Sequence, residues 1–195
     1  SIATQGGSNI NVSIDSIISR ISSDYKLVHR LDKDTSGLLI IAKNIKSAKI
    51  FGNLFKSKLI DKTYIAICEG IPKLKESNVD LDIRNKNNNI EKTKTYYKVL
   101  SYQNGLSTVL FKPITGKTHQ LRIVSKNLSC PIIGDIKYNY QSNYNREILK
   151  LNAFSLKFII ENKQFEFFSD LPKDFIDFVK KQRLKVPIKK LSFKI

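Results

Sequence analysis

Apolar residues along the 195-residue chain recur at two spacings, one typical of helices and one typical of strands. Helical spacing predicts amphipathic helices at 14–21, 45–58 and 172–182, and a short helix at 118–128. Ser13 is a suitable N-cap for the first helix, and Pro172 is a suitable opening residue for the last. Residues 1–12 are rich in Gly, Ser and Asn and are predicted to form a loop.

Continuous or alternating apolar runs predict the strands. These lie at 25–28, 37–42, 62–68, 94–102, 106–112, 151–160 and 164–168. Asn104-Gly105 is the strongest hairpin signal in the chain. Residues 71–92 are predicted to be the least structured part, with a polar loop or hairpin tip at 85–89. Because strands outnumber helices and pair mostly through hairpins, we predict an α+β fold with a mainly antiparallel or mixed sheet and flanking helices.

The charge balance changes the picture, since 34 Lys and Arg against 17 Asp and Glu leave a net charge of +17. Such a chain favours a polyanionic partner, nucleic acid first, although solvated lysines alone would give the same charge. Apolar runs such as Leu38–Ala42 are too short to span a membrane, and the N-terminus has no signal-peptide pattern. Cys68 and Cys130 form neither a disulfide framework nor a zinc motif, which fits a reducing, cytoplasmic setting.

A polar loop between two predicted strands, residues 29–37 (HRLDKDTSG), combines carboxylates, cations, hydroxyls and a glycine. Catalytic groups commonly lie on loops that rigid strands hold in place. Asp32 and Asp34 could form a carboxylate pair, but a solvated Asp that caps a turn is the simpler interpretation of the spacing alone.

A second polar cluster, residues 116–122 (GKTHQLR), precedes a predicted helix and could hold a phosphate. It lacks the spacing of a nucleoside-triphosphate loop. The chain has two histidines, His29 and His119, so a three-histidine metal site is excluded, and a half-buried structural histidine is the simpler interpretation of His119.

Tyr64 shares a predicted sheet face with Lys62 and Ala66. A tyrosine beside a lysine on such a face can stack on a nucleobase, or it can fill the core with its hydroxyl hydrogen-bonded.

Together, four elements in the same order resemble the RluA-type pseudouridine synthase family. They are HRLDKDTSG at 29–37, KTY at 62–64, GKTHQLR at 116–122 and PIIGDIKY at 131–138, against the family patterns HRLDxxTSG, K-x-Y, G-R-T-H-Q-I-R and P-I-x-G-D-x-x-Y. The resemblance covers most of residues 1–183, and the first element and the shared order make it specific. The segment QGGS at 5–8 further resembles the RluC-like large-subunit rRNA branch. The departures from the family patterns are at Lys117, Ser125, Ser129, Cys130 and Asn152.

The resemblance implies the pseudouridine synthase fold and the isomerisation of uridine in RNA to pseudouridine, with no metal or organic cofactor. Asp32 would be the catalytic carboxylate, Arg122 would pair with it and fix its direction, and Tyr64 would lie against the uracil. The target base would be flipped out of its helix, and Arg30 is a candidate to fill the space it leaves. The residues expected to bind RNA are His29, Arg30, Lys62, Lys117, Thr118, His119 and Gln120.

We expect residues 1–183 to form the catalytic domain and 184–195 a basic tail, which is either an RNA-binding arm or a solvated segment. Family members often carry an S4-type RNA-binding domain upstream, so we expect the chain to be an N-terminally truncated piece. The full expectation is a bacterial, cytoplasmic monomer that modifies large-subunit ribosomal RNA. A tRNA uridine synthase, a non-catalytic RNA-binding protein on the same scaffold and a basic ribosome-associated protein are the alternatives.

Overall fold

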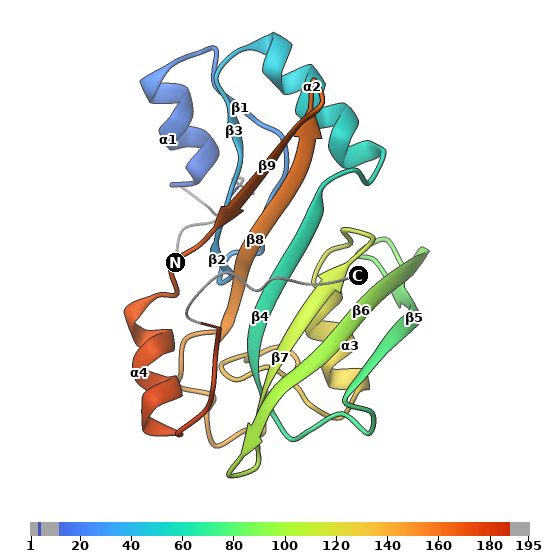
Figure 1. Cartoon of the computed structure of the whole chain (residues 1–195), viewed down its shortest axis with the longest axis vertical. Helices are drawn as coiled ribbons and strands as arrows, with labels where there is room; N and C mark the ends of the chain where they lie inside the picture. Colours follow the sequence, from blue (N-terminus) through green and yellow to red (C-terminus); the bar gives the residue numbers. More distant parts are fainter. Residues whose placement is uncertain (1–3, 5–11, 188–195) are drawn as a thin grey trace.

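The computed structural model of the chain describes Thr4 and residues 12–187. It contains a seven-stranded mixed sheet flanked by helices, with a small two-stranded sheet at one end (Figure 1). The helices are α1 (Ile14–Ile21), α2 (Ile45–Lys56), α3 (Gln120–Asn127) and α4 (Lys173–Lys181). The strands are β1 (Lys26–Leu27), β2 (Ser36–Gly37), β3 (Ile41–Ala42), β4 (Asp61–Glu69), β5 (Glu76–Arg84), β6 (Ile90–Gln103), β7 (Leu106–Pro113), β8 (Leu151–Ile160) and β9 (Lys163–Phe168).

The large sheet has the order β2-β8-β4-β7-β6-β5, and β9 also pairs with β8. The β2–β8 pair is parallel and the other pairs are antiparallel. The predicted α+β fold with a mixed sheet is therefore confirmed.

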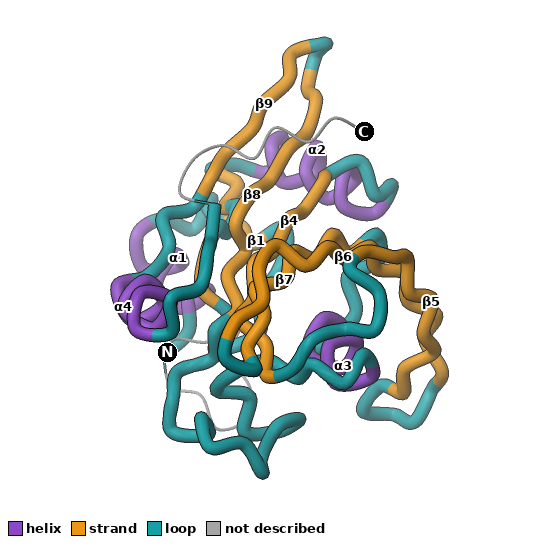
Figure 2. Tube along the Cα trace, turned by 60° about the horizontal axis from the view of Figure 1, so that its bottom comes forward, coloured by secondary structure: helices purple, strands orange, loops and turns teal. Residues whose placement is uncertain are grey.

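Central strand β4 separates two cores by the alternation of its side chains. Ala66 and Cys68 pack in the cluster that includes α3, whereas Ile65 and Ile67 pack in the cluster that includes α4. Figure 2 shows α3 within the curve of the sheet formed by β5, β6 and β7, which it contacts. Helix α2 covers a third cluster, around Ile60 at the start of β4. Both ends of β4 are thus packed, which makes it a rigid support for the polar residues that it carries.

The single strand predicted at 37–42 is wrong, because the chain divides its pairing there between two sheets. Ser36–Gly37 runs beside β8, and Ile41–Ala42 pairs with β1. Gly37 has a φ of +108°, and an added Cβ would collide with the backbone of Ala153. This close crossing turns the chain, so that Leu38 donates its N–H to the carbonyl oxygen of Ala153 (2.9 Å) and then, with Ile40, packs against the third cluster.

The weak pattern at 71–92 also gave a wrong prediction, since β5 is a nine-residue strand paired along its whole length with β6. Its outward positions are polar or charged, as in the Glu76–Lys98 ion pair (2.8 Å), which hides the alternation of Val79, Leu81 and Ile83 on the inner face. The predicted tip at 85–89 and the Asn104-Gly105 turn are both confirmed, and the two turn residues have φ values of 54° and 75°.

The packed structure continues past residue 183, where the catalytic domain was expected to end and the basic tail to begin. Leu184 is buried in the α4 cluster, and the backbone of Lys185 exchanges hydrogen bonds with the Ser101 hydroxyl. The rest of the predicted basic tail, 188–195, and the segment at 5–8 lie outside the described residues.

Candidate active site

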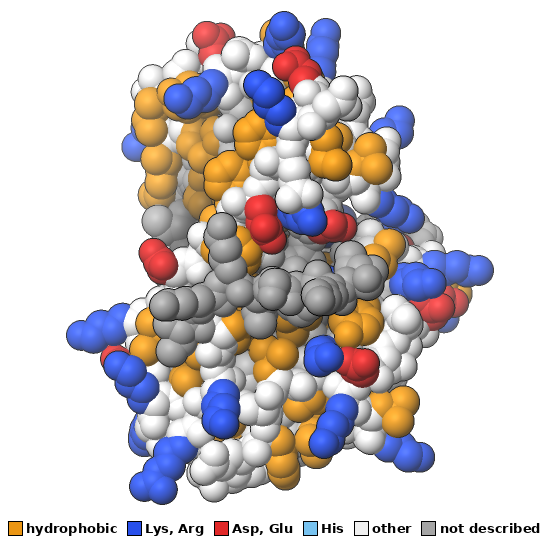
Figure 3. All heavy atoms as spheres, in the orientation of Figure 1, with side chains coloured by type: hydrophobic (Ala, Val, Ile, Leu, Met, Phe, Trp, Pro, Cys, Tyr) orange, Lys and Arg blue, Asp and Glu red, His pale blue; other side chains and the backbone are white. Residues whose placement is uncertain are grey.

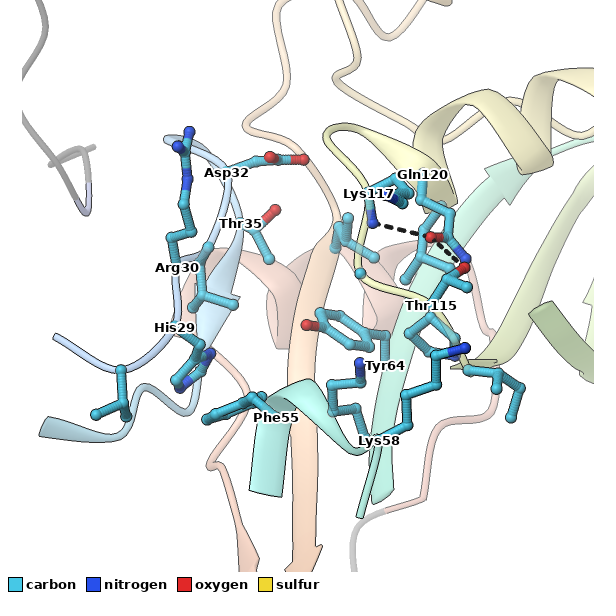
Figure 4. Close-up of a pocket in the computed structure, with 18 of the residues that line it drawn as sticks. His29, Arg30, Asp32, Thr35, Phe55, Lys58, Tyr64, Thr115, Lys117 and Gln120 are labelled. Carbon is cyan, nitrogen blue, oxygen red and sulfur yellow. Dashed lines mark hydrogen bonds between the residues drawn. The ribbon is translucent and has the colours of Figure 1, made fainter. Parts of the chain in front are cut away.

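A pocket of about 570 Å³ opens between the 29–37 loop, the end of α2, β4 and the loop that follows β7. The Asp32 carboxylate points into it, and the Tyr64 hydroxyl points from β4 toward the 29–37 loop (Figure 4). The cationic side chains that line this pocket are Arg30, Lys56, Lys58, Lys62, Lys92 and Lys117. The fold therefore gathers one carboxylate, one tyrosine and a basic rim from segments far apart in the sequence.

The loop that carries Asp32 is fixed through its backbone. Thr4, which is 4% exposed, donates its hydroxyl to the carbonyl oxygen of Leu31 (2.9 Å) and accepts from the N–H of Leu31 (3.1 Å). The N–H of Thr35 donates to the carbonyl oxygen of Asp32 (2.9 Å) and closes a turn. These bonds hold the residues on either side of Asp32 and leave its carboxylate free to face the pocket.

His29 joins the two ends of the same loop. Its Nε2 accepts from the N–H of Ile40 (2.8 Å), and its ring stacks on Phe55 of α2 with centroids 4.5 Å apart. Burial, and then the charge of Lys62, lower the pKa of His29 to about 4, so the ring is neutral at pH 7. His29 lines the pocket, with Nε2 and one ring face already used within the protein, and its RNA-binding role stays a prediction.

The charge of Asp32 acts on three surrounding side chains: Tyr64, His119 and Arg122. Burial first, and then Asp32, raise the pKa of Tyr64, so its hydroxyl is protonated at neutral pH. Tyr64 can therefore contribute its ring and a neutral hydrogen-bonding group, and a phenolate is disfavoured.

The predicted ion pair between Arg122 and Asp32 is wrong. Nε and Nη2 of Arg122 each donate to a carboxylate oxygen of Asp135 at 2.7 Å, and the side chain lies outside the lining of the pocket. Burial would lower the pKa of Arg122, but the hydrogen bonds and charge of Asp135, with Asp32 adding to them, raise it. The buried Asp135 carboxylate lies against α3 and accepts a bidentate pair of hydrogen bonds from Arg122. Asp32 is partly exposed and does not form such a pair with Arg122.

Of the other predicted RNA contacts, Lys62 lines the pocket and is half-buried. Burial lowers the pKa of Lys62; the charge of Asp61 opposes this effect, and the charge of Lys58 adds to it. Lys117 also lines the pocket, but its ammonium pairs with Glu91 at 3.1 Å.

Gln120 is buried, and its amide is fully used. Its Oε1 accepts from Thr115 and from the N–H of Lys117, while its Nε2 donates to Lys94 and Thr95. Gln120 therefore holds the loop in place where it lines the pocket, and its contact with RNA stays a prediction.

Thr118 and His119 do not line the pocket. Thr118 is exposed, and His119 begins α3 with a left-handed backbone (φ 55°) and lies 3.0 Å from the Tyr138 hydroxyl through Nδ1. The phosphate site predicted for 116–122 is thus reduced to the side facing the pocket, around Lys117.

The comparison with known proteins decides the family. The family model described as RNA pseudouridylate synthase matches residues 9–127, more than half of the chain. The chain belongs to this family. The resemblance to RluA-type synthases and to their RluC-like branch is confirmed.

Among the relatives is the ribosomal large subunit pseudouridine synthase C of Rickettsia bellii, 47% identical over 152 residues, which are 70% of this chain and 50% of that protein. An uncharacterized RNA pseudouridine synthase of Zymomonas mobilis is 32% identical over 184 residues, 86% of this chain and 84% of that protein. The solved structure of human RNA Pseudouridylate Synthase Domain Containing 4 has a TM-score of 0.83 and 25% identity, covering 95% of this chain and 88% of that one. The chain spans about half the length of the Rickettsia relatives that it matches.

Two residues of the site framework were missed from the sequence. Asp135 lies within the PIIGDIKY element, which gave a signal for the segment but no partner. Thr4 gave no signal, because its contact with Leu31 joins residues 27 positions apart.

The described residues hold no cluster of three or more His, Cys, Asp or Glu side chains suited to a metal ion. Within the same residues, no helix is long and apolar enough to cross a membrane.

Proposed function

We propose that this protein isomerises uridine to pseudouridine in RNA and that its substrate is large-subunit ribosomal RNA. The observation that carries the proposal is the placement of Asp32, which points into a basic pocket shared with Tyr64 (Figure 4). The names of the Rickettsia relatives support the choice of ribosomal RNA. We further propose that the protein acts as a monomer in the cytoplasm.

The dimensions and charge of the pocket suit one extruded nucleotide. Its volume lies within the ~300–1,000 Å³ that is usual for small-ligand sites, and a base must leave the stack of a duplex to enter such a pocket. Cations around the rim can bind the phosphates that flank the extruded base, and Arg30 lies beside Asp32 on the same loop.

In the reaction, the bond between C1′ and N1 breaks, the uracil turns, and C5 bonds to C1′. The hydrogen on C5 is released to solvent and N1 takes up a proton, so the overall change is an isomerisation. Asp32 either attacks C1′ or removes a proton from the sugar, and a carboxylate suits both roles. Tyr64 packs its ring against the uracil with its hydroxyl protonated.

The test measures tritium release from a large-subunit rRNA transcript that contains 5-tritiated uridine. Asp32→Asn keeps the shape of the side chain and removes its charge, so we expect release to fall by ~10³-fold or more. Asp34→Asn is the matched control, because Asp34 is exposed on the same loop and lines a different pocket, which does not contain Asp32 or Tyr64. We expect this control to retain normal release, and release by Asp32→Asn above a few per cent of wild type would refute the assignment.

The substrate is tested separately with unlabelled transcripts of large-subunit rRNA and of tRNA, followed by mass-spectrometric detection of pseudouridine. Product in the ribosomal transcript supports the proposal. Product in tRNA alone would refute the ribosomal substrate and keep the activity, whereas binding to RNA without product would identify a non-catalytic binding protein.

A further inference from the structure

The PIIGDIKY segment, residues 131–138, lies outside the pocket and has no part in the function proposed above. It is nevertheless attached to the strand that carries Tyr64. The N–H of Ile133 donates to the carbonyl oxygen of Ile67 (2.9 Å), and Ile132 forms a bridge with Cys68. The segment is therefore held in register with β4.

Within it, the chain makes a tight turn at Gly134. Gly134 has a φ of +77°, and an added Cβ would lie 2.6 Å from the backbone of Glu147 and Ile148. A residue with a side chain would be strained there. The turn delivers Asp135 to a position where it is 1% exposed.

The Asp135 carboxylate accepts four hydrogen bonds. Oδ2 accepts from Nε of Arg122, and Oδ1 accepts from Nη2 of Arg122 and from the backbone N–H groups of Lys137 (3.1 Å) and Tyr138 (3.0 Å). The two hydrogen bonds from the backbone fix the orientation of the carboxylate, and the bidentate pair with Arg122 fixes the plane of the guanidinium.

A ring covers the same guanidinium. The Tyr138 ring centroid lies 5.1 Å from Cζ of Arg122, and the Tyr138 hydroxyl lies 3.0 Å from Nδ1 of His119. Nη1 of Arg122 has no hydrogen-bond partner among the described residues. Asp135 thus binds one edge of the Arg122 guanidinium and Tyr138 covers one face, while the remaining N–H groups have no hydrogen-bond partner among the described residues.

We propose that Asp135 is a positioning residue for the isomerisation, which holds Arg122 in one orientation next to the Asp32 site, and that the 131–138 turn serves to supply this hold. The inference rests on the proposed function, because it gives Arg122 a task only if Asp32 is the reacting carboxylate. Gln120 and Leu121, which directly precede Arg122 on α3, line the pocket with Asp32, and the charge of Asp32 also acts on Arg122. Arg122 then provides a fixed positive charge beside the reaction, and its orientation depends on Asp135 and Tyr138.

The experiment uses single-turnover tritium release from the 5-tritiated large-subunit rRNA transcript, with enzyme in excess. The variants are Asp135→Asn, Arg122→Lys and the double variant. Asp135→Asn keeps an acceptor for the two backbone N–H groups and removes the charge from the arginine pair. We expect the maximal rate to fall ~10- to 100-fold, the size expected for a lost charge-assisted hydrogen bond, with the enzyme concentration at half-saturation changed less than ~3-fold.

A double-mutant comparison separates positioning from a general structural role. If Asp135 acts through Arg122, the double variant is no slower than Arg122→Lys alone. Asp174→Asn is the control for the loss of a buried ion pair, because Asp174 of α4 pairs with the buried Lys150 at 2.9 Å. We expect this control to lower the melting temperature and to leave the maximal rate unchanged.

A normal rate for Asp135→Asn, or effects of Asp135→Asn and Arg122→Lys that multiply, would overturn the inference. If Asp135→Asn fails to fold, Tyr138→Leu is the deciding variant, because it removes the ring over the guanidinium and keeps the backbone hydrogen bond to Asp135. A slower maximal rate at an unchanged half-saturating enzyme concentration supports the inference. A wild-type rate refutes it. No release by wild-type enzyme would instead refute the proposed function itself, and the inference with it.

Discussion

Asp32 and Asp34 are two residues apart in one loop, but the structure assigns them to different pockets. Spacing could not separate them, because the direction of each side chain depends on contacts from distant segments. Thr4 holds Leu31, and the close crossing of Gly37 over β8 fixes the other end of the loop. The resemblance to family motifs selected Asp32, and the structure supplies the physical reason why only this carboxylate lines the pocket with Tyr64.

At the same scale, His29 makes stability depend on pH. Its pKa is about 4 in the fold, against 6.5 for an unperturbed histidine, so the fold prefers the neutral ring. The stabilisation is fully present above pH 6.5, and it is lost as the pH falls from 6.5 through 4, which corresponds to roughly 3 kcal/mol.

Urea unfolding of wild type and His29→Gln at pH 7, 5.5 and 4 measures this contribution. We expect the free energy of unfolding to fall less steeply with decreasing pH in the variant. Both proteins keep His119, so the difference between their slopes reports His29 alone. Parallel slopes would show that protonation of His29 is not resisted by the fold.

The sequence predicted the helices and the β6–β7 and β8–β9 hairpins well, because these elements depend on local spacing, caps and turns. Ser13 caps α1 and Asn104-Gly105 turns the β6–β7 hairpin, as expected. It could not predict β2, whose pairing of Ser36 with Asn152 joins positions 116 residues apart, or the Arg122–Asp135 pair across a turn. The contacts of the candidate site were beyond the sequence for the same reason, as the pairing of Arg122 with Asp135 in place of Asp32 shows.

The element scale carries a prediction about Thr4, which joins the N-terminal segment to the 29–37 loop and whose carbonyl oxygen accepts from Asp15 of α1 (3.0 Å). Thr4→Val has nearly the same shape but leaves the N–H and carbonyl oxygen of Leu31 without their partner. We expect the free energy of unfolding to fall by about 1–3 kcal/mol and the single-turnover rate to fall ~10-fold, because the backbone beside Asp32 is released.

Thr4→Ser is the matched variant, since it keeps the hydroxyl and removes one methyl group. We expect it to restore most of the rate, with denaturation midpoints and tritium release measured on the same preparations. A Ser variant as slow as the Val variant would assign the effect to packing of the methyl group, and an unaffected Val variant would show that the loop does not need this hold.

For the whole molecule, the net charge of +17 does not by itself locate the RNA-binding surface. Figure 3 shows Lys and Arg side chains spread over one face and its edges, with apolar side chains gathered over the end that carries α1 and β9. The pocket lining gives a sharper criterion, because it separates cations that face the reacting base from cations elsewhere. Lys92 and Lys98 make this contrast on a single strand: Lys92 lines the pocket, whereas Lys98 pairs with Glu76 away from it.

We therefore expect the salt dependence of RNA affinity to depend on where each lysine lies, as well as on the total charge of the protein. Each phosphate engaged by a cation contributes ~0.7 to 0.9 to the slope of log affinity against log salt. We expect Lys92→Gln to lower that slope by about this amount, and Lys98→Gln, which removes the same charge from the same strand, to leave it unchanged. Binding is measured in the Asp32→Asn background, so that turnover does not alter the RNA, with a large-subunit rRNA transcript over a series of salt concentrations. An equal loss of slope in both variants would mean that RNA responds to the spread charge of the molecule, and that the rim of the pocket has no special part in binding.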